Sequence, residues 1–454
     1  MRKVLCCLLA LALLLPLAGT VKAMIGAPAR SGAAAAASAQ PAAQSTPEEA
    51  QPAAQTAPKE TQPAAQTTPE AGTPVTADSA PEAVQAGPAD APELELSAPS
   101  ALLMDAATGT VLYEHNADER REPASVTKVM TLLLVMEALD SGRISMDDKV
   151  SASAEAAAKG GSQIYLEEGE SLSMDELLKS VVVSSANDCA AALAEHVAGS
   201  EAAFVELMNR RAEELGMTNT HFVNCTGLDD EPAAREHLTT ARDVAIMSRA
   251  LLRHDAIRRY TTIWTDTVRG GQFGLSNTNK LVRFYQGTTG LKTGYTSAAG
   301  HCLSASAERE GLELIAVVLG CPASSSRFAD AKALLNWGFA NYALVRPDPE
   351  PAPQPIPVKL GAAESVLPVR SDDTPVLIRK ADRAGVTQEL TLAQELEAPV
   401  ERGQVVGSLK IRSGGELLRE YPLTAAEEVP RLSFGEIFLC VLRAVCGGSP
   451  STPG

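Results

Sequence analysis

The chain has 454 residues, of which 45% are hydrophobic and 4% are aromatic, and its formal net charge is −17. Acidic charge spread along the whole chain argues against nucleic acid as a partner. The histidines form no His-Glu-x-x-His pattern and the cysteines show no Cys-x-x-Cys spacing, so the sequence predicts neither a metal site nor another cofactor.

The N-terminus has the pattern of a secretory signal peptide over residues 1–23. A charged start precedes an apolar run over residues 4–19, and a small-residue cleavage pattern ends at Ala23. A membrane anchor, the alternative, needs about 20 apolar residues, whereas this run is shorter and contains Pro16. Export would permit disulfides, but one sequence does not reveal their pairing among Cys189, Cys225, Cys302, Cys321, Cys440 and Cys446.

Residues 24–97 are rich in Ala, Pro, Gln, Thr and Glu, and Gln-Pro-Ala-Ala-Gln recurs at 40, 51 and 62. Such a segment buries too little apolar surface to offset its ordering entropy, so we expect a disordered linker. A spacer and a passive insertion both remain open. The 357 residues from 98 to 454 exceed what one hydrophobic core supports, which predicts two domains.

A hairpin and a helix are expected next. Segments 100–105 and 110–114 flank Thr108-Gly109, which is typical of a turn between two strands. Pro123 suits the first turn of a helix that Gly142 would end. Apolar residues recur there in steps of three and four, at Val129, Leu132, Leu133, Met136 and Leu139.

Ser125 and Lys128 lie three residues apart at the start of this helix, so their side chains are surface neighbours. The free N–H groups and the positive dipole end favour a developing oxyanion there. A serine hydroxyl needs a base. Lys128 is such a base only if its pKa falls well below about 10.4 through burial or a second cation, for which Lys292 is the candidate.

The region from about 150 to 255 has helical periodicity. Ser173 and Glu176 form a capping-box pattern at the start of one helix, and residues 188–197 form another. Ser185-Ala186-Asn187 therefore falls on the loop between two helices. By itself this segment would be an ordinary helix cap.

Three consecutive strands are predicted at 291–296, 302–307 and 312–320. Lys292-Thr293-Gly294 lies on the first of them, where a glycine would let an extended peptide approach the backbone and add as an edge strand. We expect His301, beside Cys302, to be structural.

Short alternating runs separated by Gly and Pro predict a small β-sandwich over 348–430. These runs are 356–360, 374–378, 388–392, 404–411 and 417–421. They carry no motif, so a spacer role and partner docking are equally open.

The tail, residues 431–454, predicts an amphipathic helix. Residues 437–442 are continuously apolar, whereas Glu436 and Arg443 share one face. The helix is too short to span a bilayer but apolar enough to lie in its interface. A helix packed on the preceding β-sandwich is the alternative.

Three motifs occur in order, Ser-x-x-Lys at 125–128, Ser-x-Asn at 185–187 and Lys-Thr-Gly at 292–294. With the segments around them, from about 95 to 430, the chain resembles the D-alanyl-D-alanine carboxypeptidases, the low-molecular-mass penicillin-binding proteins. Two positions depart from the family pattern: Cys225 replaces a common proline, and Ala186 replaces glycine or aspartate. Neither position supplies a reacting atom.

The resemblance implies an α+β fold. A β-lactamase/transpeptidase-like catalytic domain at 98–347, with an antiparallel sheet flanked by helices and a helical subdomain, would precede the small all-β domain. Relatives often end in a membrane-anchoring helix, which favours attachment of the tail to the outer face of the cytoplasmic membrane.

The resemblance also assigns roles to individual residues. Ser125 would be the nucleophile and Lys128 its base, with Ser185 relaying a proton and Asn187 binding the substrate backbone. The substrate carboxylate would be held on the third motif, with the residues around it completing the site: Lys292, Thr293, Gly294, Tyr295 and Arg327. The N–H groups of Ser125 and Tyr295 would form the oxyanion hole. Arg327 is otherwise a surface arginine.

The implied activity is removal of the terminal D-alanine from peptidoglycan stem pentapeptides through an acyl-enzyme, with penicillins acylating the same serine. A transpeptidase or endopeptidase of this fold remains open, as does a catalytically silent wall-binding scaffold. A β-lactamase is disfavoured because no Glu-x-x-Leu-Asn stretch follows Ser185-Ala186-Asn187.

Overall fold

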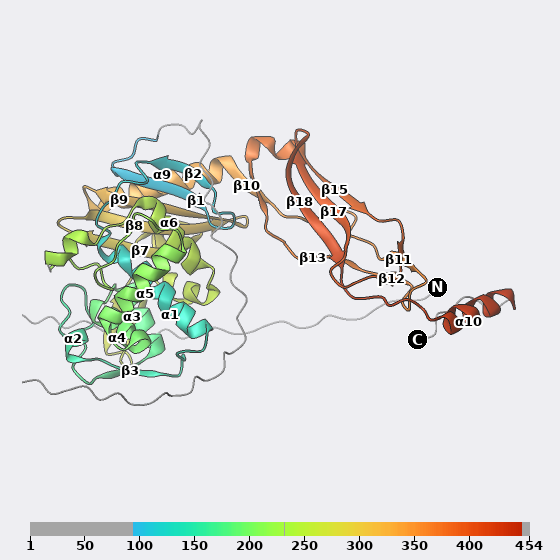
Figure 1. Ribbon diagram of the computed structural model, residues 1–454. Helices are drawn as coiled ribbons and strands as arrows, with labels where there is room; N and C mark the ends of the chain where they lie inside the picture. The colour runs from blue at the N-terminus through green and yellow to red at the C-terminus, as the bar shows by residue number, and fades with distance from the viewer. Residues whose placement is uncertain (1–93, 231, 447–454) are drawn as a thin grey trace, which may run out of the picture. The chain divides into compact units, whose positions relative to one another are not determined.

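The computed structural model describes residues 94–230 and 232–446 (Figure 1). The predicted signal peptide and nearly all of the predicted linker lie outside these residues. Leu94 and Leu96 pack against the edge of a hydrophobic core. The N–H and the hydroxyl of Ser97 both donate to Asp330 Oδ2, at 3.0 and 2.7 Å. The folded part therefore begins ahead of the predicted boundary at residue 98.

A five-stranded antiparallel sheet organises the catalytic domain, with strand order β2-β1-β9-β8-β7. Its strands are β1 (Ser100–Asp105), β2 (Val111–His115), β7 (Thr288–Thr296), β8 (Gly300–Arg309) and β9 (Leu312–Cys321). The predicted hairpin and the three predicted later strands are confirmed. Strand β7, which carries Lys292-Thr293-Gly294, lies at the end of the sheet.

Successive residues of the sheet face two different cores, as the two-residue period of a strand requires. Leu102 packs with α1 (Lys128–Asp140) and α6 (Ala241–Leu252), whereas Leu103 packs with α9 (Ser324–Asn341) on the opposite face (Figure 1). Helix α1 is apolar almost all round and buried along most of its length, which is typical of a central helix. Each fully buried leucine contributes about 1.5–3 kcal/mol.

A helical region completes the catalytic domain, as predicted. Its helices are α2 (Ala154–Ala157), α3 (Met174–Val183), α4 (Asn187–Ala198) and α5 (Glu201–Glu214), with α7 (Arg258–Thr261) and α8 (Leu281–Phe284) nearer to β7 in the sequence. Two short antiparallel strand pairs accompany them, β3 (Lys149–Ser151) with β4 (Ser171–Ser173) and β5 (Thr265–Val268) with β6 (Phe273–Ser276). The capping box of Ser173 and Glu176 is present at the start of α3.

The C-terminal all-β domain contains two further sheets, of order β12-β11-β16 and β13-β18-β17-β15. Their strands are β11 (Ile356–Lys359), β12 (Ser365–Val366), β13 (Pro368–Arg370), β15 (Val386–Leu392), β16 (Leu396–Glu397), β17 (Val405–Ser413) and β18 (Glu416–Ala425). A separate pair joins β10 (Tyr342–Val345) to β14 (Val376–Arg379). All five predicted runs are strands, whereas β12, β13 and β16 have only two or three residues and leave no readable alternation.

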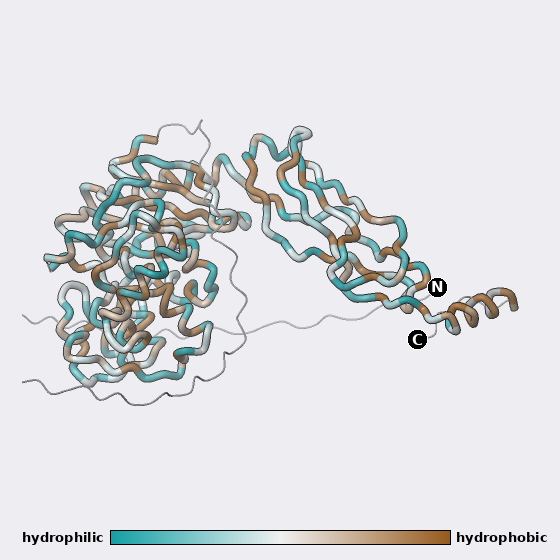
Figure 2. Tube along the Cα trace, viewed as in Figure 1, coloured by the Kyte–Doolittle hydropathy of each residue, from teal (hydrophilic) through white to brown (hydrophobic). Residues whose placement is uncertain are grey.

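Helix α10 (Phe434–Val445) ends the described chain. Figure 2 shows hydrophobic colour over most of its length, and six of its apolar side chains are exposed: Phe434, Phe438, Leu439, Val441, Leu442 and Val445. No helix within residues 94–230 and 232–446 combines the length and the apolarity needed to cross a membrane.

Candidate active site

Ser125 lies in the short helix η1 (Ala124–Thr127), which runs directly into α1. Lys128 Nζ lies 2.9 Å from Ser125 Oγ. It also donates to Asn187 Oδ1 at 2.5 Å and to the carbonyl of Thr226 at 2.9 Å. A charged lysine has three N–H donors, so in that form these acceptors occupy all of them. The spacing of the first motif therefore places the hydroxyl and the amine in contact, as predicted.

The environment of Lys128 makes its amine unusually acidic. The side chain is fully buried, and this burial lowers its pKa to about 7, against the smaller opposing effects of Cys225 and Asp188. Burial is thus the main cause of the low pKa of Lys128, and it is one of the two causes that the sequence suggested, burial or a second cation. Lys292 is also buried, and its pKa falls well below its ordinary value through burial, then through the nearby charges of Lys128 and Arg327.

Asn187 of the second motif contacts the first motif directly, because its amide oxygen accepts a hydrogen bond from Lys128. Asn187 Nδ2 donates to the carbonyl of Gly160 at 2.7 Å, so both ends of the amide are engaged. Each end keeps one further bonding position, a second N–H on Nδ2 and a second lone pair on Oδ1, and its contact with the substrate backbone stays a prediction. Ser185 is buried at φ +65° between α3 and α4, but it is not among the three partners of Lys128. Its role as a proton relay stays a prediction.

The third motif borders the segment that carries Ser125. A methyl group on Gly294 would lie 2.6 Å from the carbonyl oxygen of Pro123 and 3.1 Å from the Ser125 nitrogen. Position 294 therefore requires glycine because the backbone around Ser125 lies too close for a side chain. The sequence had instead suggested that glycine leaves room for a substrate peptide. Lys292 Nζ donates to the carbonyl of Thr293 at 2.9 Å, and the Thr293 hydroxyl donates to Thr278 at 2.7 Å.

Arg327 lies in the first turn of α9 and is buried, so it is not a surface arginine. Its guanidinium donates to the carbonyl of Gly294 at 2.8 Å, which joins α9 to the third motif. Its Nε is buried and has no hydrogen-bond partner among the described residues. Tyr295, by contrast, is 59% exposed and stacks on His301, with ring centroids 4.3 Å apart.

The cysteines near these motifs are free thiols. Cys189, Cys225, Cys302 and Cys321 are all buried and unpaired, so the described structure contains no disulfide between them. Burial raises the pKa of the Cys225 thiol well above its ordinary value, helped by Glu201, whose carboxylate accepts from it at 3.2 Å. An inert buried thiol replaces the family's proline without adding a second nucleophile.

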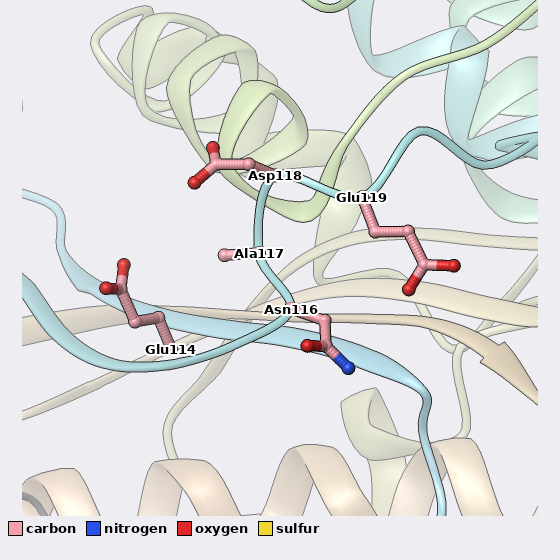
Figure 3. Close-up of a pocket in the computed structure, with 5 residues that line it drawn as sticks. All are labelled: Glu114, Asn116, Ala117, Asp118 and Glu119. Atoms are coloured by element: carbon pink, nitrogen blue, oxygen red, sulfur yellow. The ribbon is translucent and has the colours of Figure 1, made fainter.

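A separate shallow hollow of about 490 Å³ lies at the end of β2. Figure 3 shows the residues that line it: Glu114, Asn116, Ala117, Asp118 and Glu119. Arg242 bridges two of its carboxylates, Glu114 at 2.6 Å and Asp118 at 2.7 Å. Its lining contains no nucleophile and none of the motif residues, so we do not place the chemistry there.

Comparison with known proteins shows the family of this chain. The D-alanyl-D-alanine carboxypeptidase family matches residues 85–323, and the C-terminal domain of penicillin-binding protein 5 matches residues 348–431. The D-alanyl-D-alanine carboxypeptidase DacF of Bacillus subtilis is 41% identical over 348 residues, which cover 75% of this chain and 88% of the relative. The chain belongs to the D-alanyl-D-alanine carboxypeptidase family.

Two solved structures of penicillin-binding proteins support the same assignment of fold. Penicillin-binding protein 5 from Haemophilus influenzae is 31% identical, with a TM-score of 0.62, over 75% of this chain and all of that one. Penicillin-binding protein D2 from Listeria monocytogenes, in its ampicillin-bound form, is 35% identical with a TM-score of 0.50 over 55% of this chain. The predicted α+β fold with a C-terminal all-β domain is confirmed.

Sequence reasoning missed several groups around this family's motifs. The carbonyls of Thr226 and Gly160 hold Lys128 and Asn187, but a backbone carbonyl leaves no signal in residue type. Asp188 is fully buried and accepts from the N–H groups of Ile164 and Leu166, at 3.1 and 3.0 Å. Its place directly after Ser185-Ala186-Asn187 was the one available signal.

Proposed function

We propose that this protein is a serine-type D-Ala-D-Ala carboxypeptidase that removes the terminal D-alanine from peptidoglycan stem pentapeptides. One observation carries the proposal. A serine hydroxyl lies 2.9 Å from a buried lysine amine whose pKa is about 7, so a neutral base is available next to the nucleophile at physiological pH.

In the acylation step, neutral Lys128 takes the proton of Ser125 Oγ while the oxygen attacks the D-Ala-D-Ala carbonyl. The N–H groups of Ser125 and Tyr295 donate hydrogen bonds that stabilise the negative charge developing on the carbonyl oxygen. The C–N bond then breaks, and D-alanine leaves with the proton that Lys128 returns through Ser185. An ester on Ser125 remains.

In the second step, water attacks this ester and Lys128 again acts as the base. The shortened peptide leaves with a new carboxylate, and the proton returns to Ser125. A transpeptidase or endopeptidase would use the same residues with another acceptor or another scissile bond.

The substrate carboxylate would meet Lys292, Thr293 and Arg327. The position of β7 at the end of the sheet supports this, because an extended peptide adds to an edge strand by main-chain hydrogen bonds. Both cations are buried nearby, so a carboxylate would offset their charge. Penicillins carry a carboxylate beside a strained amide, and we expect them to acylate Ser125.

The test is to incubate the purified protein with a pentapeptide ending in D-Ala-D-Ala and to measure free D-alanine. Release by the wild type and none by Ser125→Ala is the expected result. Adding an amine acceptor and measuring the cross-linked product separates transpeptidase activity from hydrolysis. A wild type that releases no D-alanine and forms no cross-linked product overturns the proposal and favours a silent scaffold.

We further propose that the protein is exported and attached peripherally to the outer face of the cytoplasmic membrane through α10. The exposed apolar side chains of α10 support this proposal. Few basic residues accompany them, so attachment would depend on apolar burial and not on electrostatic binding. Co-sedimentation with phosphatidylglycerol and phosphatidylcholine vesicles should resist salt and should be lost when residues 431–454 are deleted. Phe438→Asp should weaken binding, whereas Glu436→Gln should not. Equal binding by the full-length and deleted chains, or binding by neither, contradicts the anchor.

A further inference from the structure

The residue before the nucleophile has an unusual backbone. Ala124 has φ +47°, a left-handed conformation that is unfavourable for a residue other than glycine. Its carbonyl oxygen points at Gly227, where an added methyl group would overlap that oxygen and lie 2.7 Å from Thr127 Oγ1. Gly227 itself has φ +79°. A glycine of the loop containing Asn224–Leu228 thus provides the space in which this strained carbonyl lies.

A chain of three hydrogen bonds ends on this carbonyl, and the direction of each bond is determined. The N–H of Val223 donates to His237 Nδ1 at 3.1 Å, so Nδ1 carries no hydrogen. A neutral imidazole then has its hydrogen on Nε2, which lies 2.8 Å from Thr127 Oγ1. The hydroxyl of Thr127 therefore accepts from His237 and gives its only hydrogen to the Ala124 carbonyl, at 2.8 Å.

His237 is well suited to keep this arrangement. Its side chain is only 3% exposed, and its ring packs edge-on against Phe222 with centroids 5.6 Å apart. Burial, with smaller effects of His221 and Lys128, lowers the pKa of His237 to about 4, so the ring is neutral at physiological pH. Val223, Thr127 and Phe222 contact the ring and do not change charge, and a positive charge on His221 or Lys128 only disfavours protonation of the ring further.

The consequence concerns Ser125. The carbonyl of Ala124 and the N–H of Ser125 belong to one planar peptide unit and point in opposite directions. Holding the oxygen at one end therefore orients the N–H at the other. We propose that Thr127 and His237 are positioning residues that aim the Ser125 N–H at the substrate oxyanion. This inference rests on the proposed function, in which that N–H is an oxyanion donor.

The first experiment compares Thr127→Val with Thr127→Ser. Valine keeps the shape but removes the hydroxyl, whereas serine keeps the bond to Ala124. Removing a whole oxyanion donor costs roughly 10²–10³-fold in rate. We expect Thr127→Val to slow acylation by benzylpenicillin about 10–100-fold and Thr127→Ser to restore most of the rate. Thr261→Val is the matched control, because Thr261 is also buried and donates to a backbone carbonyl, that of Thr289.

A spectroscopic readout separates aiming from loss of stability. The ester carbonyl of the acyl-enzyme, labelled with carbon-13 in the antibiotic, should shift to higher infrared frequency in Thr127→Val, because its hydrogen bonds weaken. It should not shift in Thr261→Val, even where both variants lose similar thermal stability. A purely structural role would lower the stability of Thr127→Val and leave the carbonyl frequency unchanged.

His237 offers a second, independent pair of variants. In His237→Gln the amide nitrogen replaces Nε2 and keeps the donor to Thr127, whereas in His237→Asn the amide oxygen replaces Nδ1 and keeps only the acceptor for Val223. We expect His237→Gln to acylate faster than His237→Asn. Equal rates, or an unshifted carbonyl in Thr127→Val, overturn the inference. A wild type that is not acylated at all overturns the proposed function instead.

Discussion

The catalytic domain buries charged side chains, whereas the β-domain keeps them at its surface. Lys128, Lys292 and Arg327 are buried, and the charges of Lys128 and Arg327 both act on Lys292. In the described residues of 348–430 no charged side chain is buried, and ion pairs such as Arg412 with Glu389, at 3.2 Å, lie at the surface. Burying a cation costs several kcal/mol, so a fold retains it where the charge or its loss serves a purpose. Here burial lowers the pKa of Lys128 to about 7, as its proposed role as a base requires.

The largest effect should follow from changing the base. Lys128→Arg keeps the charge but cannot readily deprotonate, so we expect acylation by benzylpenicillin to fall by about 10²–10⁴-fold. Lys410→Arg in β17 is the control, because Lys410 is partly exposed and pairs with Glu420 at 3.4 Å. Stopped-flow acylation rates check both. A Lys128→Arg rate near that of the wild type would mean that another group is the base.

Glycines give a second comparison between the two domains. Gly294 in β7 and Gly407 in β17 both have a backbone oxygen too close for a methyl group, that of Pro123 and that of Thr391. Overpacking of this kind costs about 1–3 kcal/mol. We expect both alanine variants to lose stability in urea unfolding, but only Gly294→Ala to slow acylation, by about 10–100-fold, because it moves the Ser125 segment. If Gly407→Ala slows acylation as much, the two domains are coupled.

Lys292→Arg should act mainly on substrate capture. Lys292 is buried, and arginine's larger, planar guanidinium cannot take the same place as its ammonium group, so we expect KM to rise about tenfold with a smaller change in kcat. Steady-state release of D-alanine from the pentapeptide measures both constants. A loss confined to kcat would place Lys292 in the chemical step instead.

The pH dependence should be the smallest of these effects over the physiological range. Burial lowers the pKa of Lys128 to about 7, so the amine is neutral above that pH and charged below it. The acylation rate should therefore level off above pH 7 and fall about tenfold for each unit below it. An acid limb centred near pH 4 would exclude Lys128 as the base.

The sequence predicted the main elements because their signals are local. The alternation in β15 follows from a strand that is partly buried on one face, and α1 was recognisable from its dense apolar residues between Pro123 and Gly142. The pairing of Ser125 with Lys128 was predictable for the same reason, since both lie on one turn.

The rest of the site could not be predicted because it depends on contacts between distant segments. Thr226 holds Lys128 through its backbone, so no side chain signals the contact. Gly294 has no room for a side chain because of the carbonyl of Pro123, 171 positions earlier in the sequence. His237 reaches Thr127 from a segment 110 residues away. Only the folded chain brings these groups together.

The most direct test of the account is the site at which penicillin attaches. Intact-mass analysis after incubation with benzylpenicillin should show one covalent adduct on the wild type, peptide mapping should place it on Ser125, and Ser125→Ala should show none. An unmodified wild type, or an adduct that persists in Ser125→Ala, would contradict the assignment of Ser125 as the nucleophile.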